Sequence, residues 1–125
     1  MQKFIGIGRL TKDPEKMTVG QGTALTRFTI AIQRKFKNAN GEYEADFINC
    51  VAWRKTGEFI NKYFNKGKKI AVEGMIQTRK YEDKQGNNRT AVDVVVDQAE
   101  FVESPKKQQI KADDLEPIED DDLPF

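Results

Sequence analysis

The sequence predicts an all-β fold with one short helix, followed by a disordered acidic tail. Strand-like alternation of apolar and polar residues dominates the first hundred positions, a single stretch has helical spacing, and all periodicity ends after Glu103. The 125 residues allow one domain of ordinary size with a segment left over. We therefore expect a folded domain over residues 1–103. Residues 104–125 are too poor in apolar side chains to offset chain entropy, and are predicted to form a disordered linker with an acidic tip.

The first predicted strand covers residues 3–11. Ile5 and Ile7 alternate there with Gly6 and Gly8. Glycine within a strand indicates a bulge or the close approach of another backbone. This strand also has few bulky side chains along its edge, so we expect it to pair with a copy of itself across a two-fold axis.

A turn is predicted over residues 12–15, and the second and third strands over residues 25–36 and 43–54. The dipeptide Asn40-Gly41 predicts the tight turn between these two strands. In both strands the even positions carry most of the apolar residues, so we expect even positions to face the core and odd positions the outer surface.

One short helix is predicted after the third strand. Four apolar residues within positions 59–64 recur at helical spacing. Glu58 in the first turn and Lys66 in the last turn would suit the helix dipole, and Gly67 is a natural end.

Two further strands are predicted over residues 69–81 and 90–102, joined by a polar loop. Three strands, a helix and two strands follow one another in a five-stranded Greek-key barrel, the OB-fold. An open α+β sheet fits the same order and remains the alternative.

Alternation divides the aromatic residues into two groups. Four of them match buried positions and are predicted to be core: Phe28, Phe59, Phe64 and Phe101. Phe47 and Trp53 occupy odd positions of the third strand, opposite Ile48, Cys50 and Ala52, and are predicted to lie on the outer surface. Tyr43 is assigned to neither group.

Aromatic residues interleaved with cations are typical of a platform for single-stranded nucleic acid. Bases stack on aromatic rings whatever their identity, and nearby Lys or Arg neutralise the phosphates. The predicted stacking residues are Phe36, Phe47, Trp53 and Tyr81. The other predicted nucleic-acid-binding residues are Arg9, Arg34, Lys35, Lys37, Asn49, Arg54, Arg79 and Lys80.

Composition excludes several classes of protein. Histidine is absent and Cys50 is the only cysteine, which removes Ser-His-Asp and Cys-His catalysis, zinc fingers and disulfides. No acid/base pair or phosphate-binding glycine loop is evident, so we expect no enzyme, no cofactor and no metal. Without a signal or membrane segment, the expected location is cytoplasmic and nucleoid-associated.

Charge is distributed unevenly along the chain. Residues 1–103 carry 18 Lys or Arg and 13 Asp or Glu, whereas residues 104–125 carry 3 and 7. A basic body with an acidic tail points towards nucleic acid, although charge runs are also typical of solvated surfaces.

Three segments and the end of the chain resemble the bacterial single-stranded DNA-binding protein family, including its phage-encoded members. The segments are residues 8–14, 47–54 and 74–81. The resemblance implies an OB-fold homotetramer that wraps single-stranded DNA without chemistry, its stacking aromatics falling on the four residues predicted above. It also implies that an acidic tip recruits replication, recombination and repair proteins. That tip corresponds to Asp120, Asp121, Asp122, Leu123, Pro124 and Phe125.

Departures from the family pattern concern the linker and the aromatic residues. Three of the four stacking positions are Phe or Tyr, and the linker is short and not glycine-rich. Two other functions fit the same fold. One is an OB-fold adaptor of the replication-restart machinery that acts mainly by protein contact. The other is a small nuclease, for which the predicted folded part lacks a metal-binding carboxylate cluster.

Overall fold

The computed structural model describes residues 1–103, so the predicted linker and acidic tip lie outside the described residues. The five predicted strands and the helix occur in the predicted order, with one further strand among them. The elements are β1 (Phe4–Leu10), β2 (Glu15–Val19), β3 (Thr23–Lys37), β4 (Tyr43–Trp53), α1 (Arg54–Tyr63), β5 (Lys69–Glu82) and β6 (Asn88–Phe101).

The sheet closes into a barrel because β1 has two partners. It pairs with β5 over Phe4–Arg9, and Arg9 and Leu10 pair with β3. The order is β1-β5-β6-β4-β3, and the β1–β3 pairing joins its two ends. Strands β4 and β6 run parallel, whereas the other strand pairs of residues 1–103 are antiparallel. The five-stranded OB-fold prediction is therefore confirmed.

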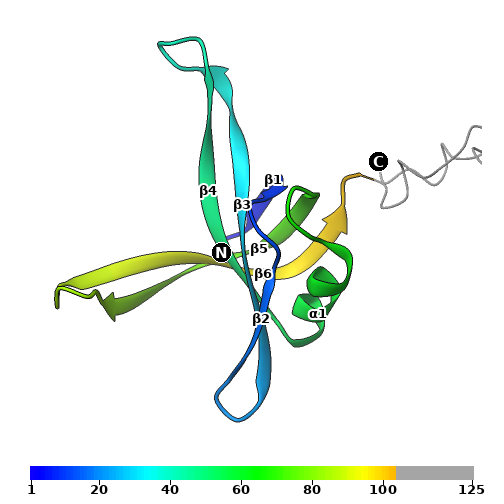
Figure 1. Cartoon of the computed structure of the whole chain (residues 1–125), viewed down its shortest axis with the longest axis vertical. Helices are drawn as coiled ribbons and strands as arrows, with labels where there is room; N and C mark the ends of the chain where they lie inside the picture. Colours follow the sequence, from blue (N-terminus) through cyan, green and yellow to red (C-terminus); the bar gives the residue numbers. More distant parts are fainter. Residues whose placement is uncertain (104–125) are drawn as a thin grey trace, which may run out of the picture.

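One strand was not predicted. β2 lies outside the closed ring and pairs only with the first half of β3. The turn between them contains Gly20 and Gly22, both with positive φ. Three hairpins, β2–β3, β3–β4 and β5–β6, extend from the barrel in different directions (Figure 1). We call the last two the β3–β4 arm and the β5–β6 arm.

The helix begins and ends earlier than predicted. It starts at Arg54, so Glu58 lies beyond its first turn, and it ends at Tyr63, before Lys66 and Gly67. Phe64 takes an extended backbone conformation, while its N–H still donates to the carbonyl of Ile60 at 3.0 Å. The ring of Phe64 stacks on Phe101 with centroids 5.0 Å apart. Packing against β6 therefore accompanies the early end of the helix.

The even positions form the core, as predicted. Residues buried together there include Phe28, Ile30, Cys50, Ala52, Ile60, Phe64, Ile70, Val72 and Val94. Phe59 and Phe101 are partly buried and pack against this core. At Gly8 an added Cβ would lie 2.6 Å from the carbonyl oxygen of Ala31, so the predicted close backbone approach is also confirmed.

Two residues depart from simple alternation. Val51 has an odd position yet is buried, because it lies in the middle of the sheet with Arg27 on one side and Val95 on the other. Ile76 shares the parity of the buried Ile70 and Val72 but is about half exposed. The register of β5 to β6 shifts between Glu73 and Gly74, and the pairing of β5 with β1 also ends at Gly74, whereas β6 still pairs with β4 at Val94 and Val95.

Candidate nucleic-acid interface

The outer face of β4 presents two large rings to solvent. Three of its odd residues, Phe47, Asn49 and Trp53, are exposed, as predicted, whereas Val51 between them is buried. Phe47 stands opposite the small Ala31 of β3, which leaves its ring uncovered. Six residues separate Phe47 from Trp53, which in a strand is about 20 Å, so the two rings would meet different bases.

The other two predicted stacking residues lie on the arms. Phe36 is near the end of β3, in the irregular stretch where the register to β4 shifts, and Tyr81 is near the end of β5. Their exposed fractions are 83 % and 43 %, beside 66 % for Phe47 and 41 % for Trp53. Because part of each ring is open to solvent, all four are available to a ligand.

Three of the predicted arginines already have carboxylate partners. Arg34 contacts Asp46 at 2.8 Å and Glu44 at 3.0 Å. The hydrogen bond to Asp46 raises the pKa of Arg34, and the same bond lowers the pKa of Asp46. Arg79 contacts Asp93 at 2.9 Å. A phosphate would have to compete with these carboxylates or use the remaining N–H groups.

Arg9 is the third paired arginine, and no hydrogen bond or salt bridge within residues 1–103 links it to the exposed rings. Its guanidinium lies 3.1 Å from Glu103 and also donates to the carbonyl of Gly67 at 2.9 Å. The hydrogen bond from Arg9 lowers the pKa of Glu103. Arg9 thus links the end of β1 to Gly67, which precedes β5, and to Glu103, which follows β6.

The other predicted cations make no salt bridge within residues 1–103. These are Lys35, Lys37, Arg54 and Lys80. Arg54 follows Trp53 directly and has a φ of 50°, the left-handed region, where the chain turns from β4 into α1. By alternation Lys80 lies on the opposite face of β5 from Arg79 and Tyr81.

Residues outside the predicted set share this face. Thr29 lies directly opposite Asn49, and its hydroxyl donates to the Asn49 Oδ1 at 3.1 Å. Tyr43 is half exposed near the tip of the β3–β4 arm, with the Lys37 Nζ 5.8 Å from its ring centroid. The polar odd positions of the second predicted strand could have indicated Thr29. The Asn-Gly turn could have indicated Tyr43, which follows it closely in the sequence.

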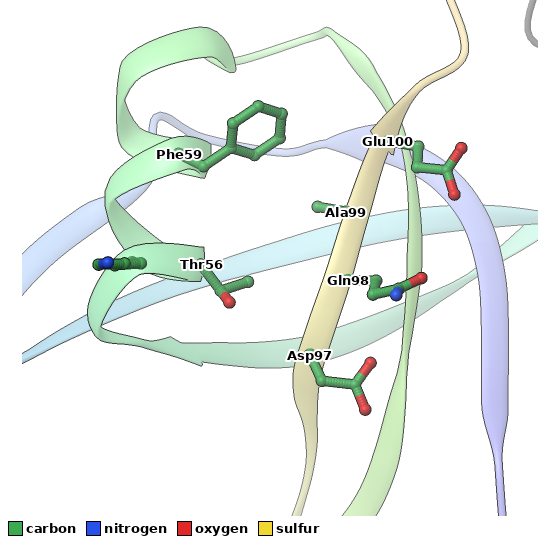
Figure 2. Close-up of a pocket in the computed structure, with 7 residues that line it drawn as sticks. Thr56, Phe59, Asp97, Gln98, Ala99 and Glu100 are labelled. Atoms are coloured by element: carbon green, nitrogen blue, oxygen red, sulfur yellow. The ribbon is translucent and has the colours of Figure 1, made fainter.

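The groove between α1 and β6 is a different kind of surface. It is open, about 460 Å³ in volume, and carries the Phe59 ring and the Thr56 side chain on the helix side (Figure 2). Asp97 and Glu100 on β6 are set against one cation, Lys55. Such a lining suits a polyanion poorly.

The residues that the structure describes contain no helix long and apolar enough to span a membrane.

A closed OB barrel with exposed rings and cations on its outer sheet has the form of an oligonucleotide-binding domain. The sequence comparison agrees with this class. Residues 1–102 match the model of the single-strand binding protein family, and the chain belongs to that family.

Several bacterial proteins named single-stranded DNA-binding protein are similar to this chain. The one from Clostridium perfringens is 50 % identical over 83 % of this chain and 67 % of its own length. The one from Clostridium tetani is 44 % identical over 100 % of this chain and 86 % of its own length. Single-stranded DNA-binding protein 2 of Listeria monocytogenes is 43 % identical over 89 % and 69 %, respectively.

Proposed function

We propose that this chain binds single-stranded DNA without sequence preference and performs no catalysis. The observation that carries the proposal is the set of four exposed rings on one barrel and its arms: Phe36, Phe47, Trp53 and Tyr81. The names of the relatives support DNA as the ligand. Each stacked base contributes about 1–3 kcal/mol, whatever its identity.

Phosphate contacts supply the remainder of the affinity. Lys35 and Lys37 of the β3–β4 arm, which make no salt bridge within residues 1–103, flank Phe36 in the sequence, and Arg54 follows Trp53. A DNA strand that passes along these rings has its phosphates within reach of the cations. Neutralising these phosphates releases counterions. The DNA strand then follows the outer face of the barrel, and in this way it wraps around the protein.

The proposed assembly is a homotetramer. Strand β1 pairs with β3 only at Arg9 and Leu10, so within residues 1–103 its edge opposite β5 has no partner strand over residues 4–8. On the same strand Ile5 is 70 % exposed and Ile7 is 51 % exposed. Pairing between two copies of β1 would cover both the edge and these side chains. Light scattering at micromolar concentration should give the mass of four chains, and a monomer mass would contradict the assembly.

Residues 104–125 are proposed to be a linker and partner-binding tip. The aspartates at 120–122 would steer a basic partner, and Phe125 would enter an apolar pocket of that partner. One buried Phe contributes only about 1.5–3 kcal/mol, which suits exchange among replication, recombination and repair proteins.

The test compares oligo(dT) with a duplex of the same length at several salt concentrations. We expect preference for the single strand, and log K for oligo(dT) falling with log salt by roughly 0.7 per neutralised phosphate. Equal affinity for the two ligands would contradict the proposal. Weak binding to both would favour the adaptor function instead.

A further inference from the structure

We infer that Asp93 is a positioning residue that holds the guanidinium of Arg79 against the ring of Tyr81, so that the β5–β6 arm presents a ready-made stacking site. The inference rests on the proposed function. It assigns a role in nucleic-acid binding to an acidic residue, whose charge alone would oppose that binding.

The register of the arm brings the three side chains to one face. Gln77, Arg79 and Tyr81 alternate along β5, and their direct partners on β6 are Asp93, Ala91 and Arg89. Asp93 is therefore the diagonal neighbour of Arg79. The small Ala91 directly opposite Arg79 leaves room for the guanidinium to cross to Asp93. The Arg79 Nε donates to the Asp93 Oδ2 at 2.9 Å, and the Arg79 Cζ lies 5.6 Å from the Tyr81 ring centroid.

Burial separates Asp93 from an ordinary surface acid. Its side chain is 9 % exposed, whereas that of Arg79 is 48 % exposed. The Asp93 Oδ1 is buried without a hydrogen-bond partner among the described residues. A half-satisfied buried carboxylate is costly to fold, and replacing such a pair by apolar residues often leaves stability unchanged or raised. A gain in folding stability therefore does not explain the carboxylate at position 93. Its hydrogen bond, which fixes the Arg79 guanidinium, does explain it.

The second arginine near the ring is held elsewhere. Arg89 is the direct partner of Tyr81, yet its Nε donates to Asp83 in the turn at 2.9 Å. Arg79 is thus the guanidinium held at the ring. Only its Nε is used among the described residues, so the two terminal nitrogens remain free to donate to a phosphate. With Arg79 against one face of Tyr81, a base stacks on the other face and its phosphate meets these donors.

The test exploits the sign of the effect. Removing an acid from a protein that binds a polyanion should tighten binding if only net charge matters. Asp97→Asn is the matched control, because Asp97 lies on β6 four residues away and has the same charge. We expect Asp97→Asn to leave affinity for oligo(dT) unchanged or slightly tighter. We expect Asp93→Ala to weaken it about three- to tenfold, a part of what one stacked base contributes.

Three further variants make the inference specific. Asp93→Asn keeps an oxygen that can accept from Arg79 and should recover most of the affinity. Arg79→Lys keeps the charge but loses the planar guanidinium, so it should weaken binding as Asp93→Ala does, and it serves if that variant does not fold. In a Tyr81→Ala background, Asp93→Ala should have no further effect.

Two results would overturn the inference. One is tighter binding by folded Asp93→Ala, as for the control. The other is an equal effect of Asp93→Ala with and without the Tyr81 ring. If the unaltered chain did not bind oligo(dT), the proposed function itself would fail, which is a distinguishable outcome.

Discussion

Cys50 is a thiol without access to solvent. Its side chain belongs to the core, with 1 % of the residue exposed. Burial, with a smaller contribution from the nearby charge of Asp93, raises the pKa of the thiol to about 12. Since the thiolate is the reactive form, the native protein should not react with a disulfide reagent at pH 8, and should react once unfolded in urea. Rapid reaction of the native protein would contradict the burial.

The same thiol predicts how stability depends on pH. In the unfolded chain Cys50 ionises near its ordinary pKa of 9.0, whereas in the folded chain it stays protonated up to about 12. Between these values the unfolded state binds fewer protons, so the free energy of unfolding falls as pH rises. Urea titrations from pH 8 to pH 11 should show this decline, and Cys50→Ala should reduce its slope. An unchanged slope would show that other groups cause the decline.

Arg34 and Lys35 are neighbours with different partners. Arg34 is held by Asp46 and Glu44, while Lys35 forms no salt bridge within residues 1–103. Lys35→Ala should therefore reduce the slope of log K against log salt for oligo(dT) by about 0.7, the contribution of one phosphate. Arg34→Ala should reduce it less, because its charge is already matched by carboxylates. Equal reductions in slope would mean that DNA displaces both carboxylates.

At the level of elements, Gly74 is where β5 bends out of the barrel. A Cβ there would overlap the carbonyl oxygen of Val95 on β6, and the register shifts at the same place. Gly74→Ala should lower the free energy of unfolding by about 1–3 kcal/mol, the usual cost of overpacking, when measured by urea denaturation. Met75→Ala is the control, since Met75 is half exposed, and should have little effect. Equal stability of the two variants would contradict the close contact.

The strands that depend on alternation were predictable, and the elements that depend on tertiary contacts were not. The helix begins at Arg54 without a side-chain cap. Instead, its Gly57 fits closely against β3 and β4: a Cβ there would lie 2.6 Å from the Ala52 carbonyl oxygen and the Thr26 Oγ1. No local pattern in the sequence marks such a contact. Strand β2 has five residues and depends on its pairing with β3, which alternation over so short a stretch does not predict.

The candidate site, too, was predictable only in part: the exposure of its rings was, and the ion pairs of its arginines were not. Exposure of Phe47 and Trp53 follows from period-two alternation alone. The carboxylate partners of Arg34 and Arg79 depend on which residues face each other across two strands, and this register is set by the whole barrel. Charge and proximity in the sequence therefore identified the arginines but not their ion pairs.

For the whole molecule, the acidic residues after position 103 are expected to compete with DNA for the basic body. Deleting residues 113–125 removes seven Asp or Glu and should tighten binding to oligo(dT) at low salt, with the difference disappearing at high salt. Deleting Phe125 alone should leave this affinity unchanged, because it removes no acidic side chain. Anisotropy titrations of the three chains make the comparison. Weaker binding after either deletion would assign the tail to DNA binding.

The exposed rings of the barrel and its arms are proposed to form the DNA-binding surface. Trp53 is the only tryptophan and lies on that surface, so its fluorescence reports DNA bound there. Titration with oligo(dT) should quench Trp53 to a sharp end point, and Phe47→Ala should weaken binding by about 1–3 kcal/mol, the contribution of one stacked base. The contrary result is tight binding of oligo(dT) without a change in Trp53 emission, together with equal affinity of Phe47→Ala and the unaltered chain. It would place the DNA on another surface.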